Sequence, residues 1–133
     1  MGKAEENKQH KRLSLLNTAF ELFTTKGVNK TSISEISEQA GIAKGTFYLY
    51  FKDKYDIRNK LISHQSGIVL SKALEALKES RIEEQYSGLE GFKKTFLFIA
   101  DNVINQFTEN KALLTFISKN LSWAIFKKAL TTN

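Results

Sequence analysis

The sequence predicts an all-α fold, and three observations support this prediction. Proline is absent from all 133 residues, so no position carries the residue that helix interiors reject most strongly. Apolar residues recur at steps of three and four along most of the chain, which is the period of a helix face. No segment shows the alternation of apolar and polar residues that is typical of a half-buried strand. We therefore expect a chain of helices without a sheet.

The first helix is predicted from about His10 to Lys26, behind a polar and flexible arm at residues 1–10. Gly27 follows it, at the position where a left-handed C-terminal cap is expected. The apolar stripe of this helix has large residues at helical spacing with Ala19 between them: Leu13, Leu16, Phe20 and Phe23.

A second, short helix is predicted to begin after Ser32. Ser32 and Glu35 have the spacing of a capping box, in which each side chain accepts a hydrogen bond from the other residue's amide. Gly41 then ends the helix after two turns. Its buried side is expected to consist of Ile33, Ile36 and Ala40.

The third helix, predicted at about Lys44 to Phe51, is also short. Phe47 and Phe51 are four residues apart and are its expected core anchors, whereas Tyr48 and Tyr50 point elsewhere. Two short helices joined by a tight glycine turn and preceded by a longer one form the helix-turn-helix arrangement, in which the third helix lies in the major groove of DNA.

A long fourth helix is predicted from Asp53, a plausible N-cap, to about Ser80. Asp56 lies in its first turn, where a negative charge suits the helix dipole. At roughly 1.5 Å per residue this helix is about 40 Å long, which suits a connector between two modules. Residues 81–91 are predicted to be a linking loop that ends in a second capping box, Ser87 to Glu90.

Two further helices are predicted beyond this loop. The first has a seam of apolar residues that we expect to be buried: Phe92, Phe96, Ile99, Val103 and Phe107. The second starts at Thr108 or Asn110 and continues an apolar helical pattern through Leu121 to Ile125. The predicted organisation is therefore an arm at 1–10, a helix-turn-helix domain at 11–60 and a helical region at 61–133.

Charge and composition restrict the class of protein. Residues 1–60 carry eleven Lys or Arg against seven Asp or Glu, a net charge of +4, and the remainder carries nine against seven, or +2. This excess suits a polyanionic partner, although an ordinary basic surface has the same composition. There is no cysteine, no apolar run long enough to span a bilayer and no leader-like N-terminus, so a cytoplasmic protein without membrane contact is expected.

Catalysis is not expected. The two histidines, His10 and His64, have no Cys, Asp or Glu at the spacing of a metal site or a catalytic triad, so we predict no enzyme activity, no metal and no cofactor.

Residues 41–54, GIAKGTFYLYFKDK, closely resemble the turn and recognition helix of the TetR (tetracycline repressor) family. The AFELF stretch of the first helix and the TSISEI stretch that opens the second are at the family's usual spacings, so the resemblance covers about residues 11–60. It implies a regulator that binds double-stranded DNA. The positions that match DNA contacts in the family are Ser32, Ser34, Ala43, Lys44, Gly45, Thr46, Tyr48, Tyr50 and Lys54.

The residue types at these positions are also suited to DNA on chemical grounds. Lys44 can donate to guanine or to a phosphate, and Thr46 can bond a base edge or offer its methyl group to thymine. The hydroxyls of Tyr48 and Tyr50 can reach phosphates, although both rings could instead be half-buried packing residues. Ser32 is expected to cap its helix whether or not it also touches a phosphate.

Beyond residue 60 the resemblance is one of architecture and implies a helical regulatory region that binds a small-molecule effector. The candidate effector residues are Phe96, Asp101, Phe107 and Trp123, although taken singly each aromatic residue fits a plain core better, and Asp101 fits a solvated surface better. Family members usually continue with two helices that form a dimer interface, so this region is shortened relative to the family. The resemblance implies a homodimer on a palindromic operator that represses transcription. The alternative is a helical ligand-binding or protein-interaction module without operator binding of its own.

Overall fold

The computed structural model describes residues 2–120, and these residues are helical along most of their length without a strand. The all-α prediction is therefore confirmed. In chain order the helices are α1 (Lys3–Thr25), α2 (Ile33–Ala40), α3 (Lys44–Tyr50), α4 (Lys54–Ser80), α5 (Ile82–Gln85), α6 (Gly88–Glu109) and α7 (Lys111–Asn120). The chain divides into two compact units. Of the described residues, one unit contains those up to Ile62 together with Phe116–Asn120, and the other contains Ser63–Thr115.

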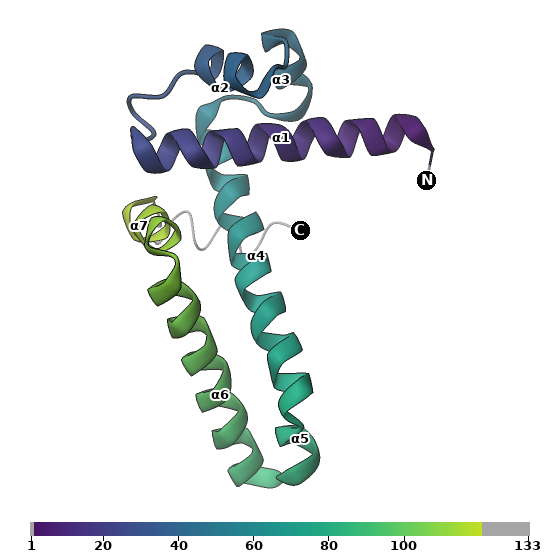
Figure 1. Cartoon of the computed structure of the whole chain (residues 1–133), viewed down its shortest axis with the longest axis vertical. Helices are drawn as coiled ribbons and strands as arrows, with labels where there is room; N and C mark the ends of the chain where they lie inside the picture. The colour runs from purple at the N-terminus through teal and green to yellow at the C-terminus, as the bar shows by residue number, and fades with distance from the viewer. Residues whose placement is uncertain (1, 121–133) are drawn as a thin grey trace. The chain divides into compact units, whose positions relative to one another are not determined.

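The N-terminal unit is a small helical core, with α2 and α3 on one side of α1 (Figure 1). The predicted anchors Phe47 and Phe51 are both buried, which confirms their assignment. The predicted stripe of α1 was partly wrong, because Leu13 is 40% exposed. The α1 residues that are buried are Leu15, Leu16, Ala19, Leu22 and Phe23.

The predicted helix ends are confirmed where side chains or glycine define them. The Ser32 hydroxyl accepts from the Glu35 amide at 3.0 Å, and the Glu35 carboxylate accepts from the Ser32 amide at 3.2 Å, which completes the capping box. Gly41 ends α2 with a left-handed backbone, φ 70°, that side chains disfavour. The Asp53 carboxylate accepts from the amides of Tyr55 and Asp56 and so caps α4.

The first helix begins earlier than predicted. It starts at Lys3 instead of near His10, and the predicted arm is helical from that residue. Its sequence favours this result, because alanine, lysine, glutamate and glutamine are good helix formers and Glu5 and Glu6 occupy the first turn, where negative charge suits the helix dipole. The lack of an apolar face therefore leaves this segment exposed without making it irregular.

One residue from the end of the described chain belongs to the N-terminal core. Phe116 of α7 is 2% exposed, and its ring lies against Phe20 and Phe23 of α1 with centroid distances of 5.5 and 6.3 Å. The division at residue 60 assigned Phe116 to the C-terminal region. The spacing within α7 shows that Phe116 is apolar but does not show which helix covers it.

In the second unit α4 and α6 run antiparallel and are connected through α5 (Figure 1). The Gln106 side chain of α6 donates to the Val69 carbonyl of α4 at 2.9 Å. The loop predicted at 81–91 is instead largely helical, since it contains α5 and the start of α6. Ser87 does occupy the N-cap position of α6, but its side chain makes no capping bond, so the predicted second capping box was wrong.

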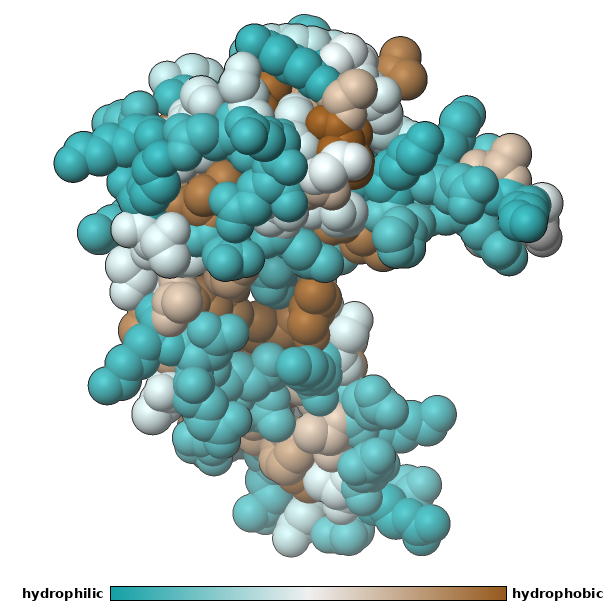
Figure 2. All heavy atoms as spheres, turned by 45° about the horizontal axis from the view of Figure 1, so that its top comes forward, coloured by the Kyte–Doolittle hydropathy of each residue, from teal (hydrophilic) through white to brown (hydrophobic). Residues whose placement is uncertain are grey.

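The apolar seam predicted along α6 is only partly covered. Phe92 is 68% exposed and Phe96 is 62% exposed, so the prediction that they form a core was wrong for both. The two rings stack on each other with centroids 6.4 Å apart. Hydrophobic side chains are accordingly visible at the surface among hydrophilic ones (Figure 2). No described helix combines the length and the apolar character that crossing a bilayer requires.

Candidate nucleic-acid interface

The turn between α2 and α3 sets the direction of the third helix. The Gly41 backbone reverses the chain, and the Ile42 amide donates to the Ser37 carbonyl at 2.9 Å. Ala43 is the N-cap of α3 in an extended conformation, and its carbonyl accepts from the amides of Thr46 and Phe47. With Phe47 turned into the core, the opposite side of α3 faces solvent.

The nine residues predicted to contact DNA all lie on the N-terminal unit, and most are accessible. Six are exposed: Ser32, Ser34, Ala43, Lys44, Gly45 and Tyr48. Three are half-buried: Thr46, Tyr50 and Lys54.

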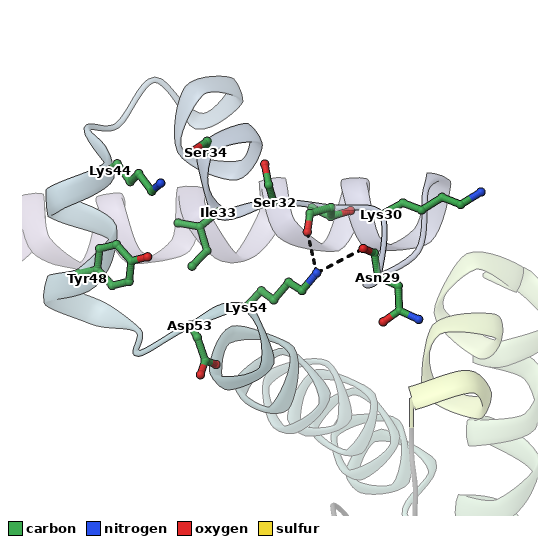
Figure 3. Close-up of a pocket in the computed structure, with 10 residues that line it drawn as sticks. Asn29, Lys30, Ser32, Ile33, Ser34, Lys44, Tyr48, Asp53 and Lys54 are labelled. Atoms are coloured by element: carbon green, nitrogen blue, oxygen red, sulfur yellow. Dashed lines mark hydrogen bonds between the residues drawn. The ribbon is translucent and has the colours of Figure 1, made fainter.

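An open hollow of about 440 Å³ brings five of these nine together: Ser32, Ser34, Lys44, Tyr48 and Lys54. Its walls come from the loop before α2, the first residues of α2, one side of α3 and the start of α4 (Figure 3). The remaining four, Ala43, Gly45, Thr46 and Tyr50, do not line it.

The chemistry of the hollow suits a negatively charged oxygen. Three lysines line it, Lys30, Lys44 and Lys54, against a single acidic residue, Asp53. That carboxylate is already engaged in capping α4. In Figure 3, Lys44 and Tyr48 extend from α3 toward the beginning of α2. Cationic and hydroxyl donors such as those of Lys44 and Tyr48 are the usual partners of nucleic-acid phosphates.

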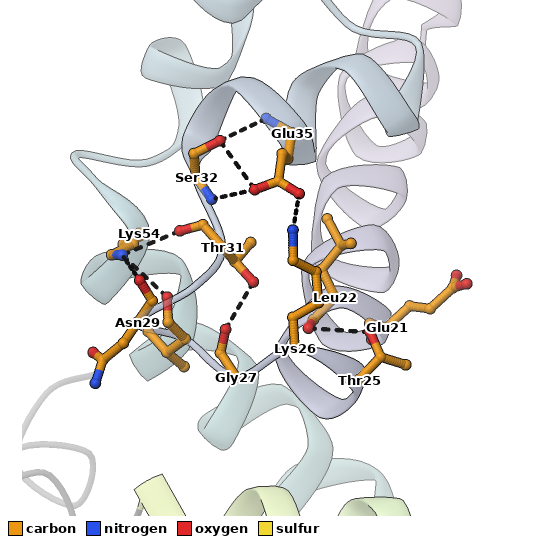
Figure 4. A network of polar contacts seen from close by, with 11 residues as sticks. Glu21, Leu22, Thr25, Lys26, Gly27, Asn29, Thr31, Ser32, Glu35 and Lys54 are labelled. Carbon is orange, nitrogen blue, oxygen red and sulfur yellow. Dashed lines mark hydrogen bonds and ion pairs between the residues drawn. The ribbon is translucent and has the colours of Figure 1, made fainter.

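Lys54 differs from the other two lysines because its ammonium is bound within the protein. It donates to three backbone carbonyls in the loop before α2: Val28 at 3.0 Å, Asn29 at 3.3 Å and Thr31 at 3.1 Å (Figure 4). An ammonium has three donors, and each has an acceptor here. Lys54 thereby ties the start of α4 to the loop that leads into α2.

The same loop is held from its other side by an ion pair. The Lys26 ammonium at the end of α1 donates to the Glu35 carboxylate, which also accepts from the Ser32 amide (Figure 4). The hydrogen bond from Lys26, followed by the one from Ser32, lowers the pKa of Glu35 below its ordinary value. The capping box is thus connected to α1 as well as to α2.

The two tyrosines of α3 have different environments. Tyr48 is 51% exposed at the edge of the hollow, with its ring edge-to-face against Phe47. Tyr50 is half-buried, packs against the core and lies 6.4 Å from the ring of Phe51. Of the pair, Tyr48 is therefore the better placed to offer its hydroxyl to a ligand in the hollow.

The candidate effector residues are not gathered in the same way. Phe96 and Asp101 are exposed, Phe107 is half-buried, and Trp123 lies outside the described residues. A small hollow of about 150 Å³ lies between α4, α6 and the start of α7, lined by residues such as Val69 and Gln106, and it contains none of the four. Their role in effector binding stays a prediction.

Metal chemistry has no candidate in the part of the chain that the structure describes. Within residues 2–120 no three side chains of His, Asp or Glu are grouped so that they could hold an ion.

Sequence analysis missed two residues at this surface. Lys30 is a third lysine that lines the hollow, and no motif marked it. Leu49, on α3, is 79% exposed. The sequence could have indicated this exposure. Leu49 lies two residues after Phe47 and two before Phe51, and that spacing places it on the side of the helix opposite these core anchors.

The fold and this exposed turn define a helix-turn-helix unit. Comparison with known proteins gives the family: residues 15–61 match the model described as bacterial regulatory proteins, tetR family. Residues 15–61 therefore have the sequence pattern of the tetR family of bacterial regulatory proteins, as the resemblance in the sequence indicated.

Curated relatives include two regulators. The fatty acid metabolism regulator protein of Bacillus subtilis (strain 168) is 31% identical over 97 residues, which are 73% of this chain and 50% of that protein. The HTH-type transcriptional regulator AcrR of Shigella flexneri is 40% identical over 58 residues, 44% of this chain and 25% of that protein. The chain therefore spans half or less of the length of these relatives.

Solved structures share the fold. A TetR family transcription regulator from Marinobacter aquaeolei VT8 matches with a TM-score of 0.66 and 18% identity, covering 96% of this chain and 64% of that one. The fatty acid degradation regulator FadR from Bacillus halodurans matches with a TM-score of 0.65 and 21% identity, covering 90% and 58%. These likenesses extend the architecture over both units.

Proposed function

We propose that the protein is a sequence-specific DNA-binding regulator of transcription that represses its target from a palindromic operator. A single observation carries the proposal. Ser32, Ser34, Lys44 and Tyr48 surround one basic hollow on the solvent side of a helix-turn-helix unit whose core anchors point the other way. Relatives of the chain bear the names of regulators, among them an HTH-type transcriptional regulator, which supports the same conclusion.

In this proposal α3 enters the major groove, and the residues at the rim of the hollow contact the DNA backbone. Lys44, Thr46 and the open backbone at Ala43 and Gly45 face base edges, while Ser32, Ser34 and the two tyrosines approach phosphates. Lys54 contributes to DNA binding indirectly, because it holds the loop before Ser32 in place. The protein works where the DNA is, in the cytoplasm.

A two-fold dimer is part of the proposal, because a helix-turn-helix protein reads two half-sites about one helical turn apart. A small molecule bound in the second unit releases the operator by favouring a different spacing of the two reading heads. The family relationship supports this mode of control.

The test is selection of genomic DNA fragments by the purified chain, with recovered fragments sequenced and affinity followed against salt concentration. We expect enrichment of one palindrome and a steep loss of affinity with salt. Lys44→Ala should weaken operator binding by about 1 to 3 kcal/mol and random DNA far less. Lys111→Ala, which removes a lysine of the other unit, serves as the matched control.

Two outcomes would overturn parts of this proposal, the first the role of Lys44 in base recognition and the second the function itself. Equal losses on operator and random DNA would reduce Lys44 to a phosphate contact. A chain that enriches no fragment would favour a ligand-binding or protein-interaction module that has no operator of its own.

A further inference from the structure

Among the described residues Leu49 is the most exposed of the large hydrophobic side chains, at 79%. Isolated apolar residues at a protein surface are common and by themselves indicate nothing. The position of this one is informative, because it lies on α3, the helix that the proposed function places in the major groove.

Helix geometry gives α3 two rows of outward residues. Lys44 and Tyr48, four residues apart, form the row beside the hollow. Gly45 and Leu49, also four apart, form the next row, away from the hollow. A Cβ atom placed on Gly45 would meet nothing within 4 Å, so this row is open at its N-terminal end and carries one large side chain at the other.

The chemistry of Leu49 restricts what it can recognise. Leucine has no hydrogen-bonding group, so it cannot read the donors and acceptors that distinguish most base edges. The thymine C5-methyl is the one apolar group that a base pair presents in the major groove. Contact between the two would remove both from water, and no polar group would be left unpaired.

We infer that Leu49 is a specificity-determining residue that reads a thymine methyl group in each half-site. This inference rests on the proposed function, since it requires α3 to lie in the major groove. The two rows of α3 then have different roles. The row with Lys44 supplies charge and hydrogen bonds, and Leu49 supplies the apolar contact that selects thymine.

The experiment is a double-mutant cycle that combines a change in the DNA with a change in the protein. Each thymine of the selected operator is replaced in turn by deoxyuridine, which removes only the methyl group, and the affinities of the wild-type chain and Leu49→Ala are measured. For the wild-type chain, one thymine position per half-site should lose about threefold to fivefold in affinity on this replacement, as expected for one buried methyl. In Leu49→Ala the thymine and deoxyuridine operators should bind equally well.

Two control variants keep the result interpretable. Leu49→Met retains an apolar side chain and should keep most of the preference for thymine. Leu70→Ala removes an exposed leucine of α4, 51% accessible, and should leave both affinities unchanged. Since Leu49 is exposed, its truncation leaves the core intact, and thermal unfolding of each variant verifies this.

The outcomes distinguish a failure of the role inferred for Leu49 from a failure of the proposed function. A wild-type chain that binds its operator but does not distinguish thymine from deoxyuridine at any position overturns the role of Leu49 and leaves the proposed function standing. The same holds if Leu49→Ala keeps the full preference. A wild-type chain that selects no DNA overturns both.

Discussion

At the scale of single residues, Lys54 makes the contact that ties the start of α4 to the loop before α2. Its ammonium reaches the carbonyls of Val28, Asn29 and Thr31, which are 23 to 26 positions away in sequence. A cation that donates to three carbonyls of one loop holds that loop in place. Lys54, which the sequence resemblance assigned to DNA contact, thus has its ammonium engaged inside the protein.

We expect Lys54→Met to lower the free energy of unfolding by about 1 to 3 kcal/mol, because hydrogen bonds to a charged group are lost while the apolar stem remains. Urea unfolding followed by circular dichroism measures the change. Lys52→Met, at an exposed neighbouring lysine, should have little effect. Unchanged stability together with a salt slope of DNA binding reduced by about one would instead make Lys54 a phosphate contact.

Glu35 gives a prediction about pH. Its pKa in the folded chain is lowered, chiefly by Lys26 and then by the Ser32 amide. The contribution of the carboxylate to stability is therefore fully present above the pKa of the unfolded state and is lost as pH falls through the folded-state pKa. Glu35→Gln should be less stable than wild type at neutral pH, and the difference should disappear in acid.

Urea midpoints of both proteins across the acidic range measure this difference. The pair is exposed, so added salt should reduce it. In a Lys26→Met background the effect of Glu35→Gln at neutral pH should shrink, because the first cause of the lowered pKa is gone. A difference that stays constant over the whole acid range would show that the charge of Glu35 has no part in it.

At the scale of elements, α7 completes the core of the N-terminal unit through one aromatic side chain. Phe116 is buried against Phe20 and Phe23 of α1. Phe96 of α6, with the same side chain, is 62% exposed. Two identical residues on neighbouring helices therefore have opposite environments, which provides a direct comparison.

Phe116→Ala should lower the free energy of unfolding of the N-terminal unit by about 3 to 5 kcal/mol, as expected for a large side chain removed from a core. Phe96→Ala should change it by about 0.5 kcal/mol or less, because an exposed ring leaves no cavity. Phe116→Leu, a milder change, keeps the comparison measurable if the alanine variant does not fold. Equal effects of the two alanine substitutions would contradict the burial of Phe116.

At the scale of the whole molecule, positive charge and the helix-turn-helix unit occur in the same part of the chain. Residues 1–60 carry a net charge of +4 out of the total of +6. In the proposed function this net positive charge attracts DNA of any sequence, and the rows of side chains on α3 supply the selection. The second unit adds little charge and exposes several apolar side chains, including Leu89, Phe92 and Phe96.

The sequence by itself determined the features that depend on neighbours in the chain. The capping box at Ser32, the left-handed Gly41, the Asp53 cap and the core anchors of α3 are all set by residues a few positions apart. Such short-range signals also gave the all-α class and the family. Five of the ten residues around the hollow were predicted from the same local motif, because that motif lies within one stretch of chain.

Only the tertiary structure decided which surfaces are covered and which distant groups meet. Helical spacing shows that Phe96 and Phe116 are apolar residues on a helix face, but burial depends on which other helix packs there. The bonds of Lys54 likewise depend on how α4 approaches a loop 23 to 26 positions earlier in the chain. These outcomes depend on the packing of elements against one another, and a periodic pattern within one helix contains no information about its partner.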